Sequence, residues 1–365
     1  MTGSHLLVNL SFLLAQPTGL SVYAGNVFPH LKPLKPTLLT SQLVADFPCQ
    51  TVPNNLTPAQ GSRGHFNRLV WTQFQLTKLY RQLKGSLLFS PIPEAPLWAD
   101  CRTVVMVHDL IPLRFPNWKS PLTSYCKFYL PLVLGQAEHI LCNSQATADD
   151  VIDYFGISAN KITPIALGYD RQHFQLGQDD LAQRRNPYFL FVGRHDPHKN
   201  VGRIIRAFAQ FVQNINVRDI DLILAGPTDR RYTPKLMALA AELGVETQVH
   251  CLDYVSYDQL RQLYRQAIAL VFPSLWEGFG FPVLESMACG TVVITSSISS
   301  LPEVGGDAVL LVDPYSIQEI YQGMEHVWKD ENLRQHLQQK SLAKAKEFSW
   351  EKTGNLTMEV LAKYL

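Results

Sequence analysis

The sequence is short of net charge, of long apolar runs and of clustered cysteines, and each shortage excludes a class of protein. Thirty-two lysines and arginines stand against 31 aspartates and glutamates, a net charge of +1, which gives no reason to expect nucleic-acid binding. No run approaches the roughly 18 consecutive apolar residues of a membrane-spanning helix. The six cysteines form no C-x-x-C pair, which indicates reduced, mostly buried thiols of a cytoplasmic protein. The apolar stretch 6–15 has no basic region before it and predicts a core strand rather than a signal peptide.

The 365 residues are too many for one ordinary core and predict two domains. Short apolar runs alternate with helical patterns, which favours βαβ units and parallel sheets. We expect strands at 6–9, 37–40, 86–89, 103–107 and 139–142, and a second series at 188–192, 222–225, 248–252, 268–272, 292–295 and 309–312. The polar, turn-rich stretch 176–187 between them is typical of a linker.

These patterns predict an α/β fold of two Rossmann-like domains that face each other across a cleft. The first domain would span 1–176 and the second 188–349. Residues 350–365 read as a helix that packs back on the first domain.

Two carboxylates stand eight positions apart in the segment from Trp276 to Glu285, around a glycine-rich turn that leads into a helix pattern. The preceding apolar run predicts a buried strand, so the turn lies where an open α/β sheet binds its ligand. Free N–H groups at a helix beginning near Phe281 can hold a diphosphate. This suits a nucleotide-sugar donor flanked by Glu277 and Glu285, and a capped turn with two solvated acids is the open alternative.

Two cations follow the first strand of the second series. Arg194 and Lys199 are five positions apart at a strand-to-helix turn, and such a pair can clamp a diphosphate and stabilise the charge that develops as it leaves.

Two other features raise the question of a metal. His195 and His198 lie in the same turn without supporting carboxylates, which is more typical of loop residues than of metal ligands. The D-x-D sequence at 219–221 leads directly into a strand and therefore lies at its amino end. We expect a solvated turn there and no metal requirement.

With these motifs in order, the chain resembles the large GT-B family of retaining glycosyltransferases. The matching elements run from about residue 6 to residue 350, and one departure is Leu167-Gly168-Tyr169-Asp170, where family members often have Asn-Gly-Val-Asp. The matches are the E-x7-E pair, the V-G-R…K-N turn with Gly193, Ala225-Gly226, 302–306, Thr18-Gly19, Val107-His108-Asp109, Asn143-Ser144 with Thr147, and Asp170 with Phe174.

The resemblance implies a role for each donor-side residue. Arg194 and Lys199 would bind the donor phosphates, Glu285 the ribose hydroxyls, and Glu277 would face the sugar. Main-chain groups of the turn would assist, and because Pro282 has no N–H, the next available donors are at Val283 and Leu284. The assisting groups are those of Phe279, Gly280 and Phe281, and the base would sit near Tyr254 and Val255.

In the first half, the resemblance implies that His108 lies beside the transferred sugar and that Gly19 lets the backbone approach the diphosphate without a Cβ in the way. A structural histidine at a strand end, with Asp109 as a helix cap, is the open alternative. Double displacement needs a carboxylate nucleophile, and the sequence near His108 offers only Asp109. Front-face transfer, in which the departing diphosphate accepts the proton of the incoming hydroxyl, is the better hypothesis.

The expected activity is transfer of a hexose from UDP-glucose, or as second choice GDP-mannose, to a carbohydrate or glycolipid acceptor in polysaccharide biosynthesis. A nucleotide-sugar epimerase, a sugar phosphorylase and a non-catalytic carbohydrate-binding protein are the alternatives. A dehydrogenase is disfavoured because no G-x-G-x-x-G follows the first strand of either domain.

The acceptor contacts are expected from loops at 54–68 and 110–119. A helix expected at 65–83 carries aromatic residues, and residues 47–93 hold five basic residues and no acid. This leaves open a peripheral contact with the inner face of the membrane, beside the alternative of a solvated basic face.

Overall fold

The computed structural model describes residues 4–13, 19–97, 99–177 and 187–365. The chain forms two compact units, one of residues 1–168 and 350–365 and the other of residues 169–349. The boundary therefore lies eight residues before the expected end of the first domain at 176, and most of the expected linker lies outside the described residues.

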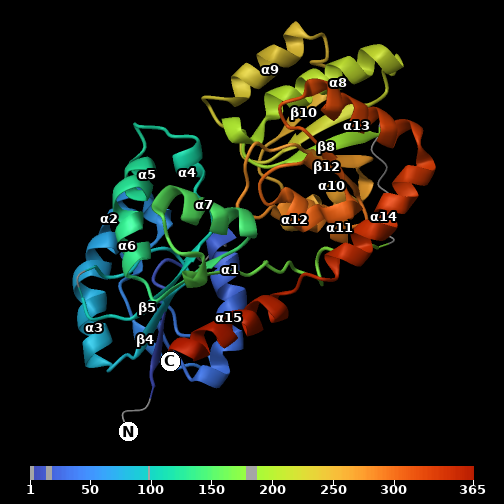
Figure 1. Cartoon of the computed structure of the whole chain (residues 1–365). Helices are drawn as coiled ribbons and strands as arrows, with labels where there is room; N and C mark the ends of the chain where they lie inside the picture. The colour runs from blue at the N-terminus through green and yellow to red at the C-terminus, as the bar shows by residue number, and fades with distance from the viewer. Residues whose placement is uncertain (1–3, 14–18, 98, 178–186) are drawn as a thin grey trace. The chain divides into compact units, whose positions relative to one another are not determined.

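A seven-stranded parallel sheet forms the centre of the first unit, in the order β3-β2-β1-β4-β5-β6-β7 (Figure 1). Its middle strands are short, apolar and buried on both faces, as strands covered by helices on both sides must be. The strands are β1 (Leu6–Asn9), β2 (Thr37–Thr40), β3 (Cys49–Thr51), β4 (Leu87–Ser90), β5 (Thr103–Val107), β6 (His139–Cys142) and β7 (Ile162–Pro164).

Helices cover both faces of this sheet. On one face, α15 (Trp350–Tyr364) packs against α1 (Gly19–Val27) and η1 (Phe28–Leu34), which ties the C-terminal helix to the first unit (Figure 1). The other face is covered by α2 (Gly61–Trp71), η4 (Thr72–Leu76), α3 (Thr77–Gln82), α5 (Pro121–Ser124), η5 (Tyr125–Tyr129), α6 (Leu130–Gln136) and α7 (Gln145–Phe155). Short α4 (Ile111–Arg114) and the turns η2 (Asn54–Leu56), η3 (Pro58–Gln60) and η6 (Ala159–Lys161) complete the unit.

The second unit contains a six-stranded parallel sheet in the order β10-β9-β8-β11-β12-β13. The chain moves outward from β8 in one direction and from β11 in the other, so the order reverses between these neighbours, and ligands of open α/β sheets bind at such a point. The strands are β8 (Tyr188–Val192), β9 (Asp221–Ala225), β10 (Val249–Leu252), β11 (Ala269–Phe272), β12 (Val292–Ser296) and β13 (Leu310–Val312).

Two helical layers enclose the second sheet (Figure 1). In one layer α8 (Val201–Ile215) packs on α9 (Thr233–Glu242) and α13 (Ile317–Lys329), and it buries Ile204, Phe208 and Phe211 at helical spacing. The other layer contains α10 (Tyr257–Gln266), α11 (Phe281–Ala288), α12 (Leu301–Gly305) and α14 (Glu331–Ala345), with the short turn η8 (Gly306–Ala308) beside α12 and α14. The short turn η7 (Pro197–Lys199) leads from β8 into α8.

The two-domain α/β prediction is confirmed, and each expected strand is present within one residue at either end. The predicted helix at 65–83 begins earlier, at Gly61, and its middle turn is a π-helix. All six cysteines are free thiols, and four of them are buried. Within the described parts of the chain, no helix combines the length and the apolar character needed to cross a membrane.

Candidate active site

Two glycines bring the ends of β8 and β9 together. Gly193 and Gly226 follow directly after these strands, with φ of 149° and 142°. A Cβ on Gly226 would lie 2.3 Å from the carbonyl oxygen of Gly193, so only glycine allows this approach. The loop that leaves β8 is thereby held against the carboxyl edge of the sheet.

Asn200 fixes the far end of that loop. Its Nδ2 donates to the carbonyl oxygens of Pro273 and Pro314 at 2.9 and 2.7 Å, and it is buried. The backbone N–H of Leu275 donates to the carbonyl of His198 at 2.7 Å. These bonds hold the loop from β8 beside the segment that leaves β11.

Lys199 and Glu277 meet at this junction. The lysine Nζ lies 2.7 Å from Oε1 and 2.8 Å from Oε2 of Glu277, and 5.4 Å from the centre of the Phe272 ring. The two side chains are 18% and 9% exposed. Because little water screens the pair, each charge is a strong potential partner for a charged ligand group.

The loop after β12 supports Glu277 from behind. The N–H of Glu277 donates to the Ser299 hydroxyl at 3.3 Å, and the buried Ser300 hydroxyl lies within 3.1 and 2.8 Å of the carbonyls of Glu277 and Phe279. Gly280 then adopts φ of 110°, a conformation that favours glycine. The turn into α11 is therefore fixed on both sides.

Glu285, on the second turn of α11, is in a different environment. The Tyr264 hydroxyl donates to its Oε2 at 3.0 Å. Burial raises the pKa of Glu285 to about 8; the Tyr264 hydrogen bond opposes this shift and the nearby Asp170 carboxylate adds to it. The carboxyl group is thus placed to accept or donate a hydrogen bond at neutral pH.

The predicted main-chain donors of α11 are wrong in part. We expected the N–H groups of Val283 and Leu284 to be available, but both donate to the Gly280 carbonyl, at 3.1 and 3.3 Å. Phe279 is buried and packs edge-on against Phe281, with ring centres 5.4 Å apart. The first turn of the helix closes one residue earlier than the proline suggested.

Three further predicted donor residues lie in loops of the second unit, and two of them are exposed. Arg194 follows Gly193, and its Nε lies 3.1 Å from Asp196 Oδ2, with 63% of its side chain exposed. Tyr254 is exposed and Val255 half-buried in the loop between β10 and α10. That loop lies at the same carboxyl edge of the sheet as Gly226, since the Thr228 N–H donates to Asp253 at 3.1 Å.

His108 lies in the first unit, directly after β5. Its Nε2 is 2.9 Å from the Pro91 carbonyl, and its own carbonyl accepts from Asn143 Nδ2 at 2.8 Å. Burial lowers its pKa to about 4. The ring is therefore neutral. Its proton is on Nε2, because the Pro91 carbonyl can only accept a hydrogen bond, and Nδ1 is left as an acceptor. Tyr23 packs edge-on against the ring.

A cavity of about 470 Å³ adjoins His108 within the first unit. Its wall contains the ion pair of Arg68 and Glu94, in which two guanidinium nitrogens each lie 2.7 Å from a carboxylate oxygen. These side chains are 4% and 7% exposed. Arg68 therefore contributes nothing to a solvated basic face. Several other lining residues lie in or next to the expected acceptor loops, namely His65, Phe66, Asp109, Pro112 and Ser120.

Two family models match the chain in succession. "Glycosyltransferase Family 4" matches residues 20–173, and "Glycosyl transferases group 1" matches residues 176–344. The O-antigen chain mannosyltransferase B of Escherichia coli is 30% identical over 274 residues, which cover 72% of this chain and 70% of that protein. The chain belongs to this glycosyltransferase family.

Other relatives of the chain carry similar names. The serotype-specific mannosyltransferase WbdA of Escherichia coli is 29% identical over 276 residues. That match covers 72% of this chain but only 34% of WbdA, so the chain spans about a third of that relative. O-antigen chain mannosyltransferase RfbU of Salmonella typhimurium is 28% identical over 85% of this chain and 87% of its own.

Solved structures confirm the GT-B fold of the chain. Sucrose-phosphate synthase from Thermosynechococcus elongatus aligns with a TM-score of 0.75 at 17% identity, covering 99% of this chain and 98% of its own. Anabaena HepE in complex with UDP-glucose aligns with a TM-score of 0.75 at 18% identity, covering 99% and 100%. At these identities the likeness concerns the fold alone.

Several motif residues hold the backbone in place. Asp109 Oδ1 accepts from the N–H of Ile111, the first residue of α4, at 3.0 Å, and Ser144 caps α7 by accepting from Thr147 N–H at 3.1 Å. Asp170 accepts from the N–H groups of two residues that follow it. A Cβ on Gly19 would meet nothing within 4 Å, whereas Thr18 lies outside the described residues.

Two of the residues that raised the question of a metal, Asp221 and His195, contact other parts of the second unit. Asp221 begins β9 at the amino edge of the sheet and lies 3.3 Å from His250. His195 is buried and bonded to the Thr233 hydroxyl at 2.7 Å. Among the described residues, no three His, Cys, Asp or Glu side chains come together as metal ligands could.

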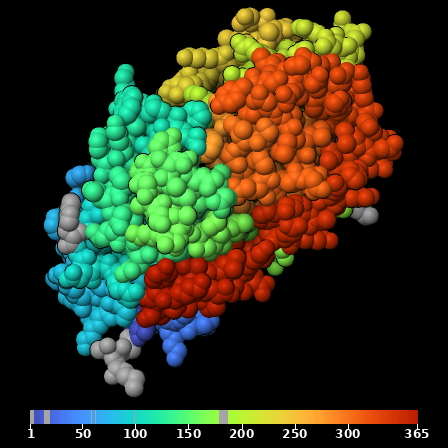
Figure 2. Space-filling view, viewed as in Figure 1, coloured from blue at the N-terminus to red at the C-terminus, as the bar shows by residue number. Residues whose placement is uncertain are grey.

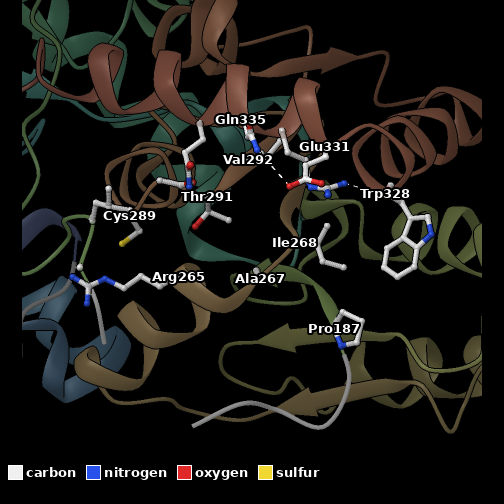
Figure 3. A pocket seen from close by; sticks show the side chains of 15 residues that line it. Pro187, Arg265, Ala267, Ile268, Cys289, Thr291, Val292, Trp328, Glu331 and Gln335 are labelled. Carbon is white, nitrogen blue, oxygen red and sulfur yellow. Dashed lines mark hydrogen bonds between the residues drawn. The ribbon is translucent and has the colours of Figure 1, made fainter. Parts of the chain in front are cut away.

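A second cavity, of about 520 Å³, lies at the amino edge of the second sheet (Figure 3). Ala267, Ile268 and Thr291 precede strands β11 and β12 there, and Glu331 and Gln335 face them from α14. None of the predicted donor residues lines it, and we assign it no function.

Sequence reasoning missed three contacts around these sites. Tyr264 lies 21 residues before Glu285, Glu94 lies 26 residues after Arg68, and Ser300 lies beyond an entire strand from Glu277. Tyr, Glu and Ser at these places are ordinary in the sequence, so no local pattern could have identified them.

Proposed function

We propose that the chain transfers a hexose from a nucleoside-diphosphate sugar to a saccharide acceptor with retention of the anomeric configuration. The observation that carries the proposal is the contact of Lys199 with both carboxylate oxygens of Glu277, at 2.7 and 2.8 Å, at the carboxyl edge of the second sheet. A cation for a phosphate and a carboxylate for sugar hydroxyls thus stand side by side where such sheets bind nucleotides.

Each donor-side residue has a proposed task. Lys199 and Arg194 neutralise the diphosphate, and Glu285, which is bonded to Tyr264, binds the ribose hydroxyls. Glu277 accepts hydrogen bonds from the sugar. The bond from the anomeric carbon to the phosphate oxygen breaks, the acceptor hydroxyl oxygen bonds to that carbon on the same face, and its proton passes to the departing phosphate oxygen. The cations lower the barrier by stabilising the charge on that oxygen.

Mannose becomes the first donor sugar to test. Three of the matched relatives are mannosyltransferases by name, at 28–30% identity, whereas the neighbour that binds UDP-glucose is 18% identical. We therefore place GDP-mannose before UDP-glucose, which reverses the order expected from the sequence.

For the acceptor we propose a growing polysaccharide, because two of the matched relatives are named for the O-antigen chain. The cavity beside His108 is the proposed acceptor site in the first unit. The apolar side chains of its wall can stack on the face of a sugar ring, and the buried Arg68–Glu94 pair can hydrogen-bond to sugar hydroxyls.

The experiment is a screen of GDP- and UDP-sugars by thermal shift and by release of the nucleoside diphosphate. GDP-mannose is expected to raise Tm, since a ligand that binds only the folded state stabilises it by mass action, and Lys199→Ala is expected to abolish the shift. Lys235→Ala, a change at an exposed lysine of α9, is the matched control.

Three outcomes would refute parts of the proposal. No response to any nucleotide sugar would overturn the function, and an inverted product anomer by NMR would overturn retention. Loss of turnover with EDTA would overturn the proposed independence from metal ions.

A further inference from the structure

Two segments of the first unit carry basic residues and no acid. Residues 61–93 and 115–136 contain no aspartate or glutamate, and their basic residues are Arg63, Arg68, Lys78, Arg81, Lys84, Lys119 and Lys127. Arg68 is buried against Glu94. The other six are exposed, so the two segments present positive charge to solvent.

The same segments expose large apolar side chains. Phe66, Val70 and Phe74, spaced by four along α2 and η4, are 66%, 42% and 72% exposed, and residues four apart share a helix face. On the second segment, Trp118 and Phe128 are 68% and 65% exposed. Exposed apolar residues are ordinary when they are scattered, but a concentration of them marks a contact surface.

A hydrogen bond joins the two segments, and cation–π contacts hold the second segment together. Gln73 Nε2 of η4 donates to the Tyr129 hydroxyl of η5 at 2.9 Å. Lys127 Nζ lies 4.9 Å from the centre of the Trp118 ring and 5.5 Å from that of Phe128. Helices α2, α5 and α6 lie side by side in Figure 1, and the space-filling view shows the second segment at the surface (Figure 2, cyan to green).

The cavity beside His108 opens onto this surface. Phe66 from α2 and Leu122 from α5 both line the cavity, and they are 66% and 53% exposed. Most of the other lining side chains are apolar, including Leu20, Leu69 and Leu130. A molecule that enters from the exposed apolar face therefore meets a wall that is mostly apolar on its way toward His108.

We propose that the surface formed by residues 61–78 and 118–132 binds an anionic lipid bilayer, and that a lipid-linked acceptor enters the cavity between Phe66 and Leu122. Basic side chains interleaved with Trp, Phe and Leu suit the interface of an anionic membrane, where the cations meet headgroups and the apolar groups enter the acyl boundary. The entry of a lipid-linked acceptor rests on the proposed function, whereas the binding of the bilayer does not.

The test is co-sedimentation of the full chain with vesicles of phosphatidylcholine alone or mixed with phosphatidylglycerol. Binding is expected to the mixed vesicles only. Each lysine near an anionic surface is worth about fivefold in the partition coefficient, so Lys119→Gln/Lys127→Gln is expected to reduce binding roughly 25-fold. Trp118→Ser/Phe128→Ser is expected to abolish the binding that persists in 0.5 M salt.

The matched control is Lys235→Gln/Lys346→Gln, which removes the same charge from exposed lysines of the second unit. Equal loss of binding in this control, equal binding to neutral vesicles, or no binding to anionic vesicles would each overturn the proposal. Self-association that Trp118→Ser/Phe128→Ser abolishes, without vesicle binding, would assign the surface to a second copy instead. The thermal response to GDP-mannose, measured on the same samples, separates failure of this surface from failure of the proposed function.

Discussion

Lys199 and Glu277 bind each other, and a diphosphate that binds Lys199 must therefore compete with Glu277 for the lysine. Both carboxylate oxygens lie within 2.8 Å of Nζ, and the two side chains are 18% and 9% exposed. Glu277→Gln removes the competing charge while it keeps the size of the side chain. We expect it to bind GDP and UDP more tightly and to transfer sugar more slowly.

The size of the gain follows from the bonds that are lost. Glu277→Gln replaces two bonds from the lysine ammonium to a carboxylate with one bond to an amide oxygen. A hydrogen bond to a charged group contributes about 1.5–3 kcal/mol, so the variant frees Lys199 by about 1.5 kcal/mol or more. That corresponds to roughly tenfold tighter diphosphate binding. If Glu277 also holds the sugar in the transition state, kcat falls by about 100-fold or more.

Isothermal titration calorimetry with GDP and UDP measures the change in diphosphate binding. Single-turnover kinetics measure the change in the rate of sugar transfer. Glu325→Gln, which breaks the exposed pair with Lys329 on α13, is the control and is expected to leave both unchanged. Unchanged or weaker diphosphate binding by Glu277→Gln would refute the competition, and unchanged transfer would refute contact with the sugar.

Three further predictions concern single residues. Burial raises the pKa of Glu285 to about 8 from its ordinary 4.5, so between these pH values the folded state binds more protons than the unfolded state. The free energy of unfolding therefore falls as pH rises through this window, by up to about 1.4 kcal/mol per pH unit. In urea unfolding, Glu285→Gln should lose this dependence on pH. Arg68→Met leaves Glu94 buried without a counter-charge and should cost about 3–5 kcal/mol in the same assay, most of it recovered in Arg68→Met/Glu94→Leu. His108→Ala should lower kcat by about 100-fold or more. Because the pKa of His108 is about 4, the rate of the wild-type protein should show no titration of this ring between pH 5.5 and 8. An inflection in that range that His108→Ala removes would contradict the neutral ring.

The strands were predictable because each is an apolar run bounded by turn residues, and burial on both faces requires that pattern. The two strands that were missed, β3 (Cys49–Thr51) and β7 (Ile162–Pro164), have three residues each and form the edges of the first sheet. Half-exposed edge strands need no apolar run. Their existence depends on backbone bonds to β2 and β6, which the local sequence does not encode.

The motif residues were predictable because Lys199 and Glu277 lie seven and five positions after the ends of β8 and β11, and Glu285 lies eight positions after Glu277. Their partners were not, because the fold alone brings Tyr264 to Glu285 and Ser300 to Glu277. The donors assigned to α11 failed for a related reason. A proline near a helix start removes one N–H, but the residue at which the first turn closes depends on the conformation of Gly280.

The two glutamates of the E-x7-E motif are equivalent in the sequence and opposite in their energetics. Glu277 faces a lysine ammonium at 2.7 Å, so replacing its carboxylate by an amide removes a favourable charge interaction. Glu285 faces a tyrosine hydroxyl and the Asp170 carboxylate, so the same replacement removes an unfavourable one. At pH 8 we therefore expect Glu277→Gln to lower the free energy of unfolding and Glu285→Gln to raise it. If both variants shift it in the same direction, at least one of the two environments is wrongly described, and measuring the pair at pH 5, where the effect of Glu285→Gln should shrink, identifies which.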